Sequence, residues 1–255
     1  MIKQLVKPLL TGKGPDFSDL TAQKRYVGNY QLGYKLPGNP VDIGKPKKPT
    51  PERVNLKPDL FKSYNIQQRY NRTFVQMEFA WWAYRGLFLQ GCSGKLSEMS
   101  MTIDVNQVEP HITLQEDNLD SLEIYLKKDI QDYYEAEQNK DGNPGVNWKA
   151  RYEFEHPDEV RANGYIPLGR LVLVAHLPDT YYRESINGVE WLHYSIRGEG
   201  VGHGRSFYWA CPLSASHFLT LGFWMTSEIG DEDLRYQRML EDAKRIMSMV
   251  ELTKD

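Results

Sequence analysis

Cysteine is scarce in this sequence: its 255 residues include two, Cys92 and Cys211, far apart along the chain. Two isolated thiols exclude a disulfide framework and a zinc site built from clustered thiolates. We therefore expect both cysteines to be small, buried, hydrophobic side chains. Nothing in the sequence predicts a cofactor or a resident metal.

Long apolar runs are also missing. The first residues, MIKQLVKPLL, alternate apolar with polar or proline positions and lack the apolar stretch of a signal peptide. No other stretch approaches the roughly 20 apolar residues needed to span a bilayer. We expect no membrane span and a cytoplasmic location, with a periplasmic one only if a leader has been removed.

Charge of either sign is not in strong excess, since the formal net charge is −3. Residues 1–60 hold 11 Lys/Arg against 5 Asp/Glu and 8 of the 14 prolines, so a basic head precedes an acidic body. The run from Gly44 to Pro51 favours an extended, solvated crossing over a basic arm for nucleic acid or lipid, because its lysines lack interleaved aromatics. We predict no nucleic-acid partner.

Hydrophobic residues are plentiful at 40%, and much of their pattern alternates. Alternation at Tyr26, Gly28, Tyr30 and Leu32 predicts one short strand before the turn at 37–38. Residues 73–90 predict two dense strands, and Met99, Met101, Ile103 and Val105 mark another. Apolar steps of three and four predict helices over 118–138, capped by Asp117 or Asn118, and over 231–249.

Strands are again predicted between these two helices. Residues 171–175 form an apolar run, and residues 181–186 face 189–196 across Asn187-Gly188, a pair suited to a type I′ hairpin. Two aromatic strands follow at 206–211 and 217–225. The order of strands, helix, strands and helix indicates an α+β fold of twisted, mostly antiparallel sheets, each packed by an amphipathic helix.

Three regions follow from this order: a basic, proline-rich head at 1–60, a first sheet-plus-helix half at 61–142 and a second at 143–255. The halves could be similar, although no residue-level repeat links them. They could equally share one continuous sheet.

Motifs for catalysis are weak. Glycines alternate in GEGVGHGRS at 198–206, but this spacing fits neither a dinucleotide loop nor a Walker loop, and a flexible hairpin loop is favoured. Cys92, in a glycine turn, would need a base such as His193 or His203 to act as a nucleophile. A metal site at His193, His203 and His217 is a further alternative that no spacing supports.

Aromatic side chains are the most prominent feature, and adjacent pairs point to opposite faces of a strand. Most would fill the core. Trp and Tyr left exposed would suit a protein interface, because they bury much area at modest entropic cost. The candidates for partner contact are Trp81, Tyr84, Tyr182, Trp191, Tyr194 and Tyr208. Trp191 and Tyr194 lie three positions apart, so we expect opposite faces, one in the core and the other accessible.

Two segments resemble immunity proteins of type VI secretion systems, particularly those paired with lipase effectors. They are RYVGNYQLGYKLP at 25–37 and GRSFYWACPLSASHFLTLGFWM at 204–225, the latter followed by the closing helix. The resemblance covers about a quarter of the chain and carries no catalytic residue. It implies a cognate toxin or effector enzyme as the partner.

The leading hypothesis is therefore a non-enzymatic protein-binding module, an immunity protein that binds and occludes a toxic effector. A small-ligand-binding protein or hydrolase is the alternative, with its pocket between the two halves near residues 91–95 and 198–206. A structural subunit of a larger assembly is a third possibility. The oligomeric state stays open.

Overall fold

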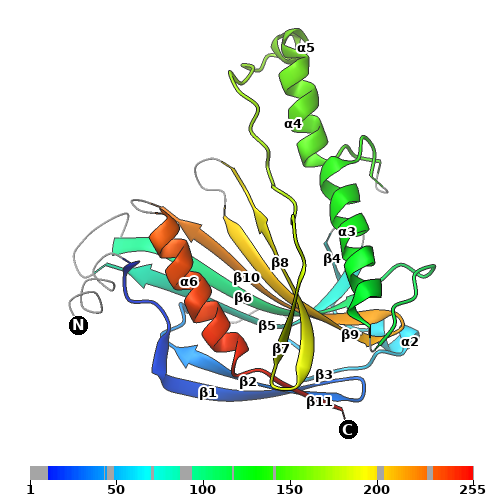
Figure 1. The fold of residues 1–255 in the computed structure, drawn as a ribbon, viewed down its shortest axis with the longest axis vertical. Helices are drawn as coiled ribbons and strands as arrows, with labels where there is room; N and C mark the ends of the chain where they lie inside the picture. The colour runs from blue at the N-terminus through cyan, green and yellow to red at the C-terminus, as the bar shows by residue number, and fades with distance from the viewer. Residues whose placement is uncertain are drawn as a thin grey trace.

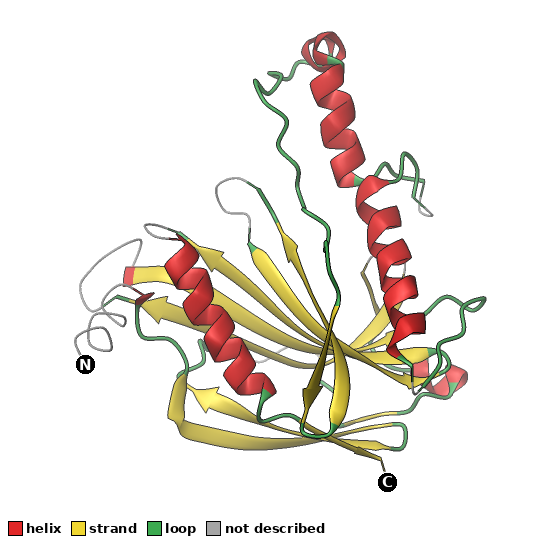
Figure 2. Cartoon of the chain, in the orientation of Figure 1, coloured by secondary structure: helices red, strands yellow, loops and turns green. Residues whose placement is uncertain are grey.

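The computed structural model describes residues 11–42, 44, 49–69, 72–86, 94–116, 118–139, 142–199, 204–228 and 232–254. Their strands form two sheets, against which two long helices pack, and a helical segment projects away from both sheets (Figures 1 and 2). This arrangement confirms the α+β class and the mostly antiparallel pairing.

The larger sheet has seven strands in the order β4-β5-β6-β10-β9-β8-β7, and every neighbouring pair is antiparallel. Its strands are β4 (Gln67–Arg69), β5 (Arg72–Arg85), β6 (Lys95–Gln107), β7 (Tyr182–Ile186), β8 (Val189–Arg197), β9 (Arg205–Ser214) and β10 (His217–Ser227). At its centre β6 pairs with β10 over the whole length of β10. The two proposed halves therefore share one continuous sheet, and residue 142 is not a boundary between sheets.

The smaller sheet has the order β11-β2-β1-β3, with β3 parallel to β1. It comprises β1 (Asp16–Val27), β2 (Tyr30–Gly38), β3 (Arg53–Val54) and β11 (Glu251–Lys254). The prediction of one short strand in the head is wrong: β1 and β2 form a long hairpin that turns after Val27, where Gly28 has φ +55°. Because β11 pairs with β2, the C-terminal strand completes the sheet built by the head.

The two long helices cover opposite faces of the seven-stranded sheet. The last helix, α6 (Glu232–Met247), contributes Met239 and Ile246 to a core shared with the small sheet and one face of the large sheet. The other helix, α3 (Leu119–Glu135), places Leu122 and Leu126 in a second core on the opposite face. Both faces of the large sheet are thus covered where these elements lie.

Several local predictions are confirmed. Asn118 caps α3 by accepting a hydrogen bond from the Asp120 amide at 2.7 Å. Asn187 and Gly188 both have positive φ, +50° and +80°, and join β7 to β8 as the tight hairpin requires.

Other local predictions are corrected. Residues 72–85 form one strand, β5, where two were expected, and 87–93 lie outside the described residues. The apolar run at 171–175 lies outside the named strands. Residues 143–162, not predicted as helical, contain α4 (Val146–Glu155) and α5 (Pro157–Ala162), and a short helix, α2 (Pro58–Phe61), precedes β4.

Candidate protein-binding surface

Three of the six aromatic candidates are buried in the structure. Trp191 and Tyr194 lie on opposite faces of β8 as expected, but both are in the core. Trp191 packs among residues of the α6 side and Tyr194 among those of the α3 side. Tyr84 is also fully buried. The expectation that these three contact a partner is wrong, because helices and the small sheet cover both faces of the strands that carry them.

The other three candidates retain some exposure. Tyr182 is exposed on β7, the edge strand of the large sheet. Trp81 and Tyr208 are partly buried. Tyr208 stacks on Tyr194 with ring centroids 5.0 Å apart and also lies against Gly222, where an added Cβ would sit 3.0 Å from its ring. Its ring is therefore held in place by the sheet rather than free to reorganise.

The exposed apolar side chains instead gather on a projecting arm, defined here as residues 146–174. It consists of α4, α5 and a return segment, 163–174, that leads back toward β7. Figure 1 shows the arm extending beyond α3 and away from both sheets, and Figure 2 shows the return segment without helix or strand. Of the thirteen large hydrophobic side chains exposed among the described residues, seven lie on the arm: Tyr152, Phe154, Tyr165, Ile166, Leu168, Leu171 and Val174.

Hydrogen bonds fix the base of the arm. Buried Asn147, at the start of α4, donates to the Ala175 carbonyl at 2.6 Å and accepts from the Ala175 amide at 3.0 Å. It also donates to Glu135, the last residue of α3, which Arg151 contacts as well. These Arg151 hydrogen bonds, followed by the Asn147 bond, lower the pKa of Glu135 despite its partial burial. The two legs of the arm are therefore tied to each other and to α3.

Stacked rings and carboxylates mark the outer part of the arm. Trp148, Tyr152 and His156 form a ladder along α4 at four-residue spacing, with centroid distances of 5.1 Å and 4.2 Å. The Tyr152 hydroxyl donates to Glu159 at 3.0 Å, which raises the pKa of the tyrosine. Asp158 pairs with Arg161 at 2.6 Å. The arm thus presents apolar side chains close to hydrogen-bonded carboxylates.

The sequence contains local signals for the helices of the arm. Gly145 precedes a segment of mostly good helix formers, and Pro157 stands at the start of a second helix, as proline often does. Gly164, Pro167 and Gly169 interrupt the apolar run that follows. What the pattern could not show is that this run is solvated, since apolar side chains look the same in sequence whether buried or exposed.

The hypotheses of catalysis gain no support from the described residues. Cys92 and His203 lie outside them, as do residues 45–48 of the proline-rich crossing and 200–203 of the glycine loop. Cys211 is buried, and burial raises the pKa of its thiol, which makes it inert at neutral pH. Burial also lowers the pKa of His217 to about 4 and lowers that of His193, which stacks on Trp209.

Metal binding gains no support from the same described ranges. They contain no group of three His, Cys, Asp or Glu side chains placed to hold a metal ion. In that part of the chain, no helix combines the length and apolar character needed to cross a membrane.

Comparison with known proteins adds no relative: family models, curated proteins and solved structures all yield no match to this chain. The function must therefore be argued from the surface itself.

Proposed function

We propose that this chain is a non-enzymatic protein-binding module that contacts its partner through the projecting arm. The observation that carries the proposal is the concentration of exposed apolar side chains on the arm. Ile166 is 92% exposed and Leu168 is 65% exposed, on a segment without a core of its own. Large contiguous apolar patches are uncommon on proteins that act alone and commonly mark interaction sites.

The construction of the arm suits a recognition role. Its base is held by the Asn147–Ala175 hydrogen bonds, so the return segment leaves and rejoins the fold at defined points. Pre-ordering a loop before binding lowers the entropic cost of association. Apolar anchors surrounded by polar groups, as beside Asp158 and Glu159, also match the anatomy of protein interfaces.

For the partner class we propose a toxic effector enzyme that the chain occludes, as an immunity protein would. The support is the resemblance of 25–37 and 204–225 to such proteins. These segments correspond largely to the β1–β2 hairpin and to β9 and β10, which belong to the scaffold rather than to the arm. A shared scaffold with a separate projecting surface would let related proteins bind different effectors.

The test compares two charged substitutions at equally exposed apolar positions. Leu168→Asp alters the arm, whereas Ile124→Asp alters α3 outside the arm, where Ile124 is 69% exposed. Each variant would be co-expressed with the effector enzyme encoded beside it, and growth and affinity would be measured. We expect Leu168→Asp to abolish protection and weaken binding by about tenfold or more, as loss of a central anchor does.

The control should protect as well as the unmodified chain. Equal binding by both variants would remove the arm from the interface. Unchecked growth inhibition in the presence of the unmodified chain would refute the immunity role, while retained binding would leave the binding module intact.

A further inference from the structure

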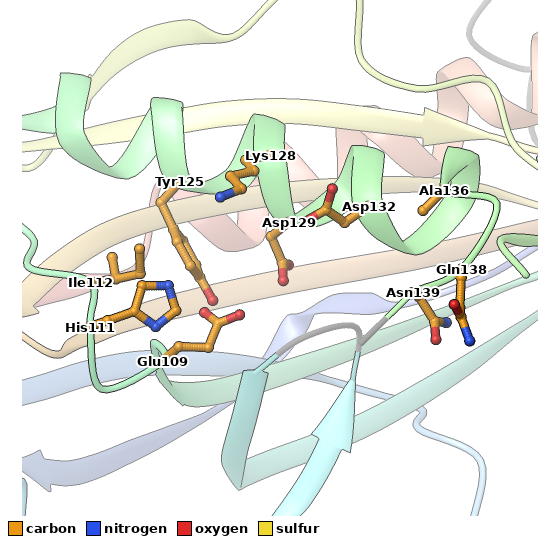
Figure 3. Close-up of a pocket in the computed structure, with 10 residues that line it drawn as sticks. All are labelled: Glu109, His111, Ile112, Tyr125, Lys128, Asp129, Asp132, Ala136, Gln138 and Asn139. Carbon is orange, nitrogen blue, oxygen red and sulfur yellow. The ribbon is translucent and has the colours of Figure 1, made fainter. Parts of the chain in front are cut away.

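A small hollow lies beside α3, on the side facing the segment that follows β6. Its volume is about 240 Å³. Tyr125, Asp129 and Asp132 reach it from α3, and Glu109 and His111 reach it from the opposite wall (Figure 3). Lys128, Ile112, Ala136, Gln138 and Asn139 complete the lining. Three carboxylates therefore border a space of the size of one small polar group or side chain.

Two polar groups in this hollow lack partners. Tyr125 is only 7% exposed, and its hydroxyl has no hydrogen-bond partner of acceptable geometry among the described residues. Oε2 of Glu109 is likewise buried and unpartnered within that part of the chain. Figure 3 shows the hydroxyl and this carboxylate directed toward the same space. Buried polar atoms are nearly always hydrogen-bonded, so an unsatisfied pair facing a hollow points to a molecule that fills it.

The charges around the hollow favour a cation. Asp129 is buried and has a cation on its inner side, because Arg72 Nε lies 3.7 Å from its Oδ2. Glu109 and Asp132, in contrast, form no ion pair among the described residues, and Lys128 is exposed to solvent. The hollow thus keeps two carboxylates without a charge partner beside the compensated Asp129.

The geometry distinguishes between kinds of cation. A metal ion needs ligand atoms gathered at one point, and the carboxylates do not form such a group in the described chain. A guanidinium group is planar, carries five N–H donors and can bond two carboxylates at once. It could therefore satisfy Glu109, Asp132 and the Tyr125 hydroxyl from one position.

We propose that this hollow binds a guanidinium group, supplied by a small free cation or by an arginine side chain of a partner protein. This site is separate from the arm and does not depend on the arm contacting a partner. The chemistry is the same for both sources, so suitable probes can distinguish them.

Binding would be followed by titrating the isotopically labelled full chain and recording the backbone amide shifts of α3. The probes are agmatine, which represents a free cation, and N-acetyl-arginine methylamide, which represents an arginine within a protein. The citrulline analogue of the second probe has the same shape without the charge. We expect saturable shifts with one or both cationic probes and none with the citrulline analogue.

Tighter binding of agmatine would identify a free cation as the ligand, and equal or tighter binding of the arginine probe would identify a protein side chain. No saturable shift with either cation, or equal shifts with citrulline, would overturn the proposal.

Charge-neutralising variants locate the site. Glu109→Gln and Asp132→Asn should each weaken probe binding about tenfold, because each removes a charge-assisted hydrogen bond. Glu137→Gln, an exposed change just beyond α3 that does not line the hollow, is the matched control and should alter affinity less than about twofold. Unchanged affinity in both lining variants would overturn the assignment.

Two further variants separate this site from other effects. Lys128→Ala removes the one lysine that lines the hollow and should strengthen binding by up to about fivefold, with the gain reduced in high salt. Leu168→Asp, on the arm, should leave probe binding unchanged. A loss of probe binding in Leu168→Asp would contradict the independence of the two sites.

Discussion

The hydroxyl of Tyr84 on β5 donates a 2.8 Å hydrogen bond to Oδ2 of Asp242 on α6. Both side chains are buried, and Arg238 Nε lies 3.2 Å from the same carboxylate oxygen. The bond therefore joins the large sheet to the last helix through a carboxylate that is shielded from water. A buried carboxylate depends strongly on its few partners, because water cannot replace one that is removed.

Tyr84→Phe should destabilise the fold by about 1–3 kcal/mol at neutral pH, because Asp242 loses a donor. The loss should shrink in mild acid. Burial raises the pKa of Asp242 above its ordinary value of 3.8, whereas Arg238 and the Tyr84 hydrogen bond act in the opposite direction. A raised folded-state pKa means that the contribution of this group to stability is highest below 3.8 and falls as pH rises through the folded-state pKa.

Removing the Tyr84 hydroxyl should raise the pKa of Asp242 further and so increase the destabilisation on the neutral side. Urea denaturation of both proteins at several pH values would measure this difference. Tyr152→Phe is the control, since it removes an exposed hydrogen bond to Glu159 and should cost little. A Tyr84→Phe effect that is identical across the pH range would contradict the role assigned to the Asp242 charge.

Trp191→Ala and Tyr194→Ala should both destabilise strongly, each by about 3–5 kcal/mol, because each empties a large volume in one of the two cores. Neither should alter the partner affinity of the protein that remains folded. Tyr182→Ala, at the exposed edge of the same hairpin, should change stability by less than about 1 kcal/mol. Thermal or urea denaturation decides the matter, and a stable Tyr194→Ala variant would show that the α3-side core tolerates the cavity.

The sequence predicted best those elements that local chemistry determines. Asn187-Gly188 specifies a turn that few other pairs can form, and Asn118 supplies a cap at the position where the apolar spacing of α3 begins. The β1–β2 hairpin was not predicted because alternation continues through its turn. There the pair Gly28-Asn29 was the available signal, since Gly28 adopts a positive φ.

What the sequence could not supply was the relation between distant elements. Tyr194 and Trp191 have the composition of interface residues, and only the packing of α3 and α6 on opposite faces shows that both are buried. The arm failed in the opposite sense, because Ile166 and Leu168 resemble core residues and yet are solvated. Likewise, Glu109 and Asp132 meet across the hollow only because α3 folds back over the segment after β6.

The ion pair of Arg72 with Asp129 should be sensitive to loss of either partner. Both side chains are buried, and the Arg72 guanidinium also lies 5.2 Å from the Phe218 ring centroid. Asp129→Leu should cost about 3–5 kcal/mol, because it leaves a buried guanidinium charge without its carboxylate. The double variant Arg72→Met with Asp129→Leu should recover most of that loss. Urea denaturation of the single and double variants measures the coupling, and additive losses would contradict it.

Asn187 joins the β7–β8 hairpin to the end of α6. Its side-chain amide donates to the Ser248 carbonyl at 3.0 Å and to the Val250 carbonyl at 2.7 Å, while its backbone holds a positive φ. Asn187→Gly keeps the turn but removes both bonds, so we expect a loss of about 1–2 kcal/mol. Asn187→Ala should lose about 1 kcal/mol more, because a Cβ without a polar group is strained at this φ.

The neighbouring Gly188 isolates the strain term. It has φ +80°, and a Cβ added there would meet no atom within 4 Å, so Gly188→Ala introduces strain without a clash and should cost about 1–2 kcal/mol. Denaturation curves of the three variants would therefore separate the hydrogen bonds from the turn. If Asn187→Gly proves as stable as the unmodified chain, the two bonds to the α6–β11 connection contribute nothing, and the hairpin is held by its strand pairing alone.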